Sequence, residues 1–85
     1  MKLFWPCAKH LMEDGRIESL CTYDSCLDLA HARKVIADWR DWYKYDIRKA
    51  WIDVYESGKK IEVIHINPKT DEIIIKGGNR NVPQI

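Results

Sequence analysis

The chain has 85 residues, of which 46% are hydrophobic and 11% aromatic, and its 14 lysines and arginines nearly balance 13 aspartates and glutamates. This length fits a single domain, and the apolar content excludes an intrinsically disordered chain. The net charge of +1 disfavours the one-signed field of a dedicated nucleic-acid binder or an acidic nucleic-acid mimic.

The N-terminal part of the sequence predicts a β-hairpin formed by residues 2–11 and 16–23, with its turn at residues 13–15. A three-residue loop that ends in glycine is typical of a type I turn followed by a bulge, in which Gly15 adopts the left-handed conformation at little cost. Pro6 has no backbone N–H to donate, so we expect the first strand to lie at the rim of the sheet.

The register of this hairpin follows from its turn, counting outward from a hydrogen-bonded pair of Met12 and Arg16. The resulting pairs are Leu11 with Ile17, Cys7 with Cys21, and Trp5 with Tyr23. The apolar residues of both strands then share one face of the hairpin. Cys7 and Cys21 fall on a non-hydrogen-bonded pair, where α-carbons are about 4.5 Å apart. A disulfide is geometrically possible there, but we expect it to stay open in a reducing compartment.

Residues 25–43 predict one amphipathic helix that covers the sheet and ends between residues 43 and 45. Ser25 is a suitable N-cap, and Asp28 places a favourable negative charge in the first turn. Apolar residues recur at spacings of three and four, which is typical of a helix with one buried face. They are Leu29, Ala32, Ile36, Trp39 and Tyr43.

A second hairpin is predicted from residues 49–56 and 59–66, joined by the two-residue loop at 57–58. This loop pairs Val54 with Ile61 and Ile52 with Val63, and it places these four residues on one face. Asp53 would then lie opposite Glu62. Because two like charges directly opposite destabilise a sheet, we expect the face that carries them to be exposed.

A last strand is expected at residues 72–76, after a turn at 67–71. Its three consecutive isoleucines, 73–75, do not alternate with polar residues, so either both faces are covered or one isoleucine is exposed. The predicted order is ββαβββ, an α+β fold with a single helix on an antiparallel sheet of four to five strands. Residues 1–78 would form the domain, and residues 79–85 an irregular tail.

The cysteines offer the main candidates for chemistry, although we expect no catalytic site, metal or cofactor. Cys7, His10, Cys21 and Cys26 form a possible zinc set. However, residues three apart on a strand point to opposite faces, so Cys7 and His10 diverge unless a bulge lies between them. Free cysteines also usually pack as small hydrophobic residues.

If the protein has enzymatic activity, the alternative that the sequence offers is thiol chemistry at Cys26. At the first helical position, this thiol would lie at the positive end of the helix dipole, which lowers its pKa. His31 follows five residues later, about 140° around the helix, and is therefore a poor general base. We accordingly expect a non-enzymatic protein.

The segment after the helix predicts a partner-binding surface, because aromatic and cationic residues alternate there. Protein interfaces are enriched in tryptophan, tyrosine and arginine. The residues predicted to bind the partner are Arg40, Trp42, Tyr45, Arg48 and Trp51. The predicted function is therefore a small protein-binding module that acts as an accessory, regulator or inhibitor.

Two other kinds of partner remain open. Single-stranded nucleic-acid sites also combine aromatic with basic residues, and the basic residues available here are Arg33, Lys34, Arg40, Lys44, Arg48 and Lys49. Asp41 and Asp46 dilute the positive field, so nucleic acid is the less favoured partner. The isoleucines at 73–75 could also pair with a second copy along the edge of the sheet, which would give a homodimer.

We expect a cytoplasmic protein with no membrane partner. The apolar run at the N-terminus is shorter than the roughly 7–15 residues of a secretory signal. No stretch approaches the roughly 20 apolar residues that span a bilayer. Three cysteines, an odd number, fit a reducing compartment better than a disulfide framework.

Overall fold

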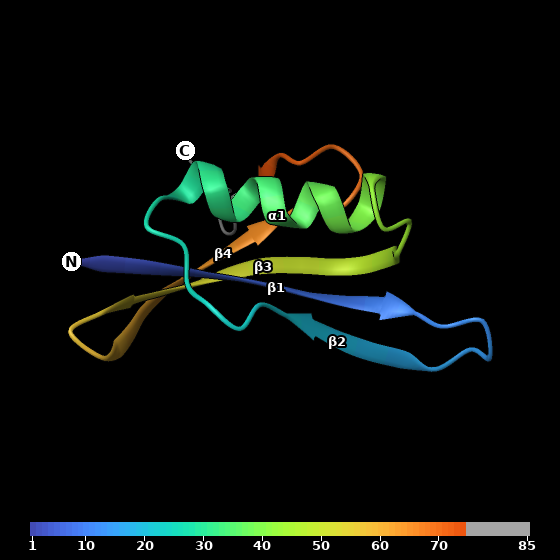
Figure 1. Cartoon of the computed structure of the whole chain (residues 1–85), viewed down its shortest axis with the longest axis horizontal. Helices are drawn as coiled ribbons and strands as arrows, with labels where there is room; N and C mark the ends of the chain where they lie inside the picture. The colour runs from blue at the N-terminus through green and yellow to red at the C-terminus, as the bar shows by residue number, and fades with distance from the viewer. Residues whose placement is uncertain (75–85) are drawn as a thin grey trace, which may run out of the picture.

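Five strands and one helix make up residues 1–74, the part of the chain that this computed structural model describes (Figure 1). They are β1 (Lys2–Leu11), β2 (Ile17–Cys21), α1 (Leu29–Asp41), β3 (Asp46–Glu56), β4 (Lys59–Ile66) and β5 (Ile73–Ile74). The strands form one antiparallel sheet in the order β2-β1-β3-β4-β5. The helix lies across one face of this sheet (Figure 1). The predicted α+β class and the order ββαβββ along the chain are confirmed.

The hydrophobic core lies between α1 and the sheet. Alternate residues of β3 are buried there, with Ala50, Ile52 and Val54 each at most 1% exposed. The core cluster consists of Ala8, Cys26, Ala32, Ile36, Trp39, Ile47, Ala50, Ile52, Val54 and Ile66. The predicted helix stripe is confirmed at its three central positions. Tyr43 lies beyond the end of the helix and is 61% exposed, so its predicted burial is wrong.

The position of β1 differs from the sequence expectation, because β1 pairs with β2 on one side and with β3 on the other. The prediction that it lies at the rim is therefore wrong. Pro6 is tolerated because of where its nitrogen points. In a strand, residues two apart direct their N–H groups to the same side, and the Phe4 N–H points to the carbonyl of Cys26. The nitrogen of Pro6 consequently faces the stretch beyond Cys21, the last residue of β2, where no ladder partner is required.

The first hairpin has the predicted turn and register, since Cys7 lies opposite Cys21 and Gly15 has a φ of 90°. The predicted pair of Trp5 with Tyr23 does not form, because β2 ends at Cys21. Tyr23 is fully exposed. The chain leaves the sheet at this point to reach the layer of the helix.

The helix begins later than predicted. Its N-cap is Asp28, whose Oδ1 accepts a hydrogen bond of 2.7 Å from the backbone N–H of His31, so the prediction of Ser25 as N-cap is wrong. Instead of starting the helix, Cys26 forms an isolated β-bridge with Phe4, with two backbone hydrogen bonds of 2.7 and 2.8 Å. This bridge holds the connection extended, which delays the first helical turn.

The second hairpin forms, but its register differs from the prediction because of a bulge next to Val54. Ile52 pairs with Ile64, Asp53 pairs with Val63 and Val54 pairs with Glu62. The predicted pairs Val54 with Ile61 and Ile52 with Val63 are therefore wrong. Asp53 does not face Glu62, so the like-charge conflict is absent.

At the other edge of the sheet, Ile73 and Ile74 of β5 are 40% and 45% exposed. Two exposed isoleucines differ from both expected alternatives, which were two covered faces or one exposed isoleucine. Glu72 precedes β5, so the predicted start of this strand at residue 72 is one residue too early. Residues 75 and 76 of the predicted strand, the domain boundary at 78 and the predicted tail at 79–85 lie outside the described residues. No helix within the described range is long and apolar enough to cross a membrane.

Candidate functional site

The face of the sheet opposite α1 is the main candidate surface, because no described element covers it (Figure 1). Side chains alternate between the two faces of a strand, so the neighbours of buried residues point to this side. Strand pairing then brings these residues side by side, with Leu3 opposite Tyr55, Trp5 opposite Asp53, and Cys7 between Trp51 and Cys21. We call this surface the open face and define it by Leu3, Trp5, Cys7, Cys21, Trp51, Asp53, Tyr55 and Val63.

A groove of about 530 Å³ lies within the open face. Residues of β1 and β3 line it together with Cys21 and the turn at Ser57 and Gly58. Most of these lining side chains are apolar or aromatic, and Asp53 is the one charged residue among them. Small-molecule and side-chain binding sites commonly combine an apolar lining with a few placed polar groups.

Asp53 is an unusual residue for such a place, because its side chain is only 15% exposed. Its Oδ1 atom is buried and accepts no hydrogen bond from residues 1–74. Lys60 is the nearest cation, but its Nζ lies 3.6 Å from Oδ1, which makes an ion pair too long to be a hydrogen bond. The Oδ2 atom has the Cys7 thiol at 3.8 Å. Burial of a carboxylate with so little compensation is costly.

Cys7 and Cys21 lie next to each other in the groove, with their sulfur atoms 3.9 Å apart, and both are free thiols. Burial of Cys7, followed by the effects of Cys21 and Asp53, raises its pKa to about 12. Because the thiolate is the reactive form, Cys7 is a poor nucleophile at neutral pH. Cys21 is exposed and is therefore the accessible thiol of the pair.

Cys26 does not have the environment predicted for it. It lies before the N-cap and is only 4% exposed. Burial, and secondarily the charge of Asp28, raises its pKa. The lowered pKa that was expected at a helix N-terminus is therefore wrong, and with it the physical basis for thiol chemistry at this residue.

The four residues of the possible zinc set are divided between the two sides of the sheet. Cys7 and Cys21 lie on the open face, whereas Cys26 belongs to the core under the helix. His10 is also buried on the helix side, where its ring contacts Tyr45 edge-on at 4.8 Å. Across the described residues, no three histidine, cysteine or acidic side chains are grouped as metal ligands.

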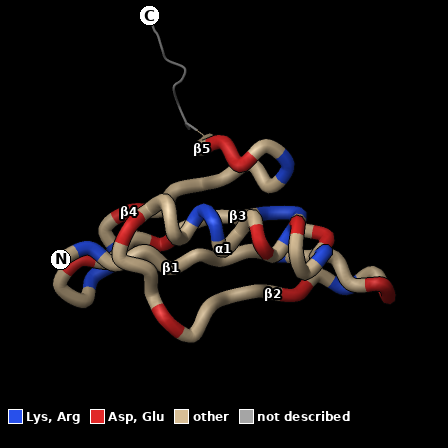
Figure 2. The backbone as a smooth tube through the Cα atoms, turned by 45° about the horizontal axis from the view of Figure 1, so that its top comes forward, with Lys and Arg blue, Asp and Glu red and all other residues tan. Residues whose placement is uncertain are grey.

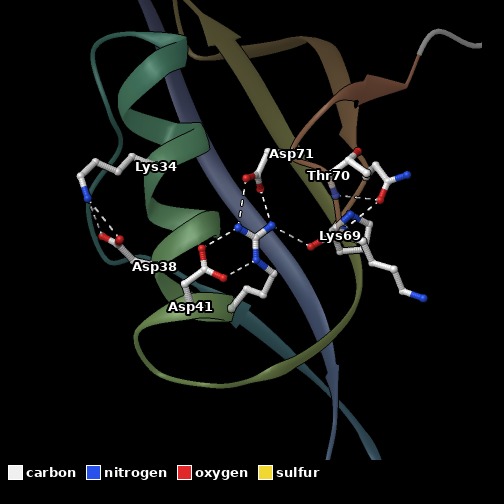
Figure 3. Close-up of polar contacts among 9 residues, drawn as sticks. Lys34, Asp38, Asp41, Lys69, Thr70 and Asp71 are labelled. Atoms are coloured by element: carbon white, nitrogen blue, oxygen red, sulfur yellow. Dashed lines mark hydrogen bonds and ion pairs between the residues drawn. The ribbon is translucent and has the colours of Figure 1, made fainter.

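Arg40, one of the five predicted partner-binding residues, is engaged within the fold. Its guanidinium donates hydrogen bonds of 2.7 and 3.0 Å to the Asp71 carboxylate and one of 3.0 Å to the carbonyl of Pro68. Asp41 accepts two more, each of 2.6 Å. Figure 3 shows Asp41 and Asp71 on either side of this guanidinium. These hydrogen bonds, first those to Asp41, raise the pKa of Arg40. The residue thus fastens the end of α1 to the β4–β5 connection.

The other four predicted residues do not form one surface. Trp42 is the C-cap of α1 and is 79% exposed, whereas Tyr45 packs partly against the core. Arg48 is paired with Asp46 through two hydrogen bonds of 3.0 Å. Trp51 points to the open face, with the Lys49 ammonium 5.6 Å from its ring centre. The structure therefore groups Arg40, Trp42 and Tyr45 near the end of the helix and separates Trp51 from them.

Sequence reasoning missed the groove and the position of Asp53 in it. The signal was present in part, because residues 3, 5 and 7 and residues 51, 53 and 55 each occupy one face of a strand. What joins the two sets is the pairing of β1 with β3, which places Cys7 opposite Trp51. Comparison with known protein families, with curated proteins and with solved structures found no match to this chain.

Proposed function

We propose that this protein is a non-enzymatic protein-binding module whose partner docks on the open face. The observation that carries the proposal is the uncovered row of large apolar side chains on three adjacent strands. Antiparallel sheets with one solvated face normally carry polar residues on that face. Here Leu3, Trp5, Tyr55 and Val63 are found instead. Contiguous apolar surface of this kind marks interaction sites in small proteins.

The surface predicted after the helix has less support as the main contact. Arg40 and Arg48 are both held by aspartates of the same chain, so docking there would have to compete with existing ion pairs. Trp42 is still a large exposed ring at the edge of that region. Trp51 belongs to the proposed surface in either case, since it lies on the open face.

The role as an accessory, regulator or inhibitor and the cytoplasmic location are part of the same proposal. The odd number of cysteines, three, supports a reducing compartment, because a disulfide framework pairs its cysteines.

Nucleic-acid binding has weaker support. Basic and acidic residues are mixed along the described part of the backbone (Figure 2), and Lys34, Arg40 and Arg48 each form an ion pair with an aspartate. Binding to a single-stranded oligonucleotide that weakens steeply as salt is raised would reverse this preference, since phosphate contacts produce that dependence.

Site-specific crosslinking in an extract of the native cell tests which surface is used. A photoreactive benzoylphenylalanine replaces Tyr55 on the open face, Trp42 at the helix end or, as a control, the fully exposed Tyr23. We expect a discrete crosslinked protein from position 55 and none from position 23. A product of twice the mass would identify a second copy docked on the open face, which differs from the edge-to-edge homodimer considered from β5.

A crosslink from position 42 without one from position 55 would show that the partner docks at the end of the helix and not on the open face. Absence of any product at both positions would contradict the proposal of a protein-binding module.

A further inference from the structure

We infer that the groove on the open face receives a lysine or arginine side chain from an apolar segment of the partner protein, with Asp53 as its counter-ion. This inference rests on the proposed function and gives the partner a stated chemistry. Asp53 lines the groove with a largely buried, charged side chain.

In the described part of the chain, the carboxylate of Asp53 lacks a hydrogen-bond donor for one of its two oxygen atoms. Among residues 1–74 its Oδ1 accepts no hydrogen bond, although the atom is buried from solvent. The Lys60 ammonium at 3.6 Å compensates the charge only in part, and the Lys60 side chain is 48% exposed. A buried acceptor without a donor is costly, whereas a charge-assisted hydrogen bond from an incoming cation is among the stronger contacts that a carboxylate can make.

The lining of the groove suits a long basic side chain better than a small inorganic cation. A divalent metal needs several oxygen ligands, and Asp53 is the single carboxylate that lines the groove. Lysine and arginine bury an aliphatic stem along apolar surface while they direct the charged group to a polar one. Trp5, opposite Asp53 on β1, and Tyr55, two residues further along β3, provide ring surface next to this position, and such rings also attract cations.

The shape of the groove favours a segment of protein as the source of that side chain. The cavity of about 530 Å³ lies on a sheet surface, and apolar residues of the open face extend beyond it to Trp51 and Val63. Apolar residues that flank the basic one would contact this surrounding area. The expected ligand is therefore a short apolar segment with one central arginine or lysine.

Amide NMR of the full chain with two blocked pentapeptides, Leu-Val-Arg-Val-Leu and Leu-Val-Gln-Val-Leu, tests the inference. We expect the arginine peptide to bind about tenfold or more tightly than the glutamine peptide, because the charged hydrogen bond is present only in the first. The amide signals of Trp5, Cys7 and Tyr55 should shift in this titration.

Asp53→Asn keeps the shape of the side chain and removes its charge, so it should abolish the preference for arginine. Glu62→Gln is the matched control. It removes an exposed negative charge from β4 at a position opposite Val54, on the other side of the sheet, and should leave the preference intact. Equal affinity for the two peptides in the unmodified protein, or a preference that survives Asp53→Asn, would overturn the inference.

The stability of the variant separates a binding role from a structural one. Because Asn at position 53 removes a poorly compensated buried charge, the urea midpoint should stay the same or rise. A clearly lower midpoint would show that Asp53 serves the fold through Lys60, which contradicts the inference. As a second variant, Lys60→Met leaves Asp53 in place and removes its competing cation, so it should tighten binding of the arginine peptide. Weaker binding would count against the inference.

The C-terminal segment of the chain itself also contains basic residues, Lys76 and Arg80. A further experiment must therefore distinguish this segment from a partner side chain as the ligand of the groove. If the double substitution Lys76→Gln and Arg80→Gln tightens peptide binding, that segment occupies the groove and the inference of a partner side chain is wrong. If the peptide experiment fails but position 55 still gives a crosslink, the inference of a basic side chain in the groove is wrong. The proposal that the partner docks on the open face is then still supported.

Discussion

The two thiols in the groove differ in their readiness to react, although they are neighbours. Cys7 is buried, and its pKa is raised to about 12 by burial, by Cys21 and by Asp53. Cys21 is exposed. Any reaction with an oxidant in solution should therefore begin at Cys21, and Cys7 should act only afterwards.

We expect oxidised glutathione to join Cys7 and Cys21. The thiolate of Cys21 attacks the reagent and releases one glutathione, then the sulfur of Cys7 attacks that of Cys21 and releases the second. The closing step should accelerate as pH rises through the alkaline range, because only the thiolate of Cys7 attacks and burial raises the pKa of this thiol. Mass spectrometry should show the loss of two hydrogens, and a bridge across a loop of this length should stabilise the fold by roughly 3 kcal/mol.

The Cys7→Ser variant is the control for this reaction, and it should stop at a mixed disulfide between Cys21 and glutathione. Cys26, buried under the helix, should stay unmodified throughout. Modification of Cys26 before Cys21 would contradict the assignment of the accessible thiol.

At the scale of elements, the start of α1 can be tested directly. Asp28→Ala removes the side chain that accepts from the His31 N–H, and loss of an N-cap typically costs about 1 kcal/mol of the free energy of unfolding. Ser25→Ala is the matched control and should change that free energy little. Urea unfolding measures both, and a larger loss from Ser25→Ala than from Asp28→Ala would restore the N-cap predicted from the sequence.

The elements show which features a sequence can specify. The first hairpin was predicted with its register because Gly15, at a φ of 90°, fixes the turn and the turn fixes the pairs. The second hairpin was predicted without its register, because the bulge beside Val54 leaves no mark in the local pattern. The helix start was misplaced because serine and aspartate are equally good caps, and the bridge from Cys26 to Phe4 decides between them.

Residues 1–74 share one core, and β3 lies at the centre of the sheet between β1 and β4. Unfolding should therefore be a single cooperative transition, as is usual for small domains. Ile36, which is 1% exposed, should lose about 2–5 kcal/mol of stability on substitution by alanine. Circular dichroism and tryptophan fluorescence should report the same shifted midpoint.

Val63→Ala on the open face is the control for this variant. Val63 is 40% exposed, so its truncation should shift the midpoint much less than Ile36→Ala. Separate midpoints for the two signals would show that the strands unfold independently of the helix.

At this largest scale, the candidate site could not be derived from the sequence, because it depends on contacts between distant residues. Trp51 was predicted to share one partner-binding surface with Trp42, which is nearby in the chain. It lies instead opposite Cys7, on a different strand. The burial of Asp53 follows from the same long-range pairing, whereas local reasoning placed that residue on an exposed surface.

The position of β1 also has a consequence for synthesis. The ribosome makes this strand before β3, yet one of its two long edges pairs only with β3, which begins at Asp46, 35 residues after the end of β1 at Leu11 (46 − 11 = 35). Until β3 leaves the exit tunnel, the nascent chain presents an apolar strand with one unpaired edge, the kind of segment that attracts chaperones and other nascent chains. The helix cannot shield it earlier, since much of the surface on which the helix packs is not yet made.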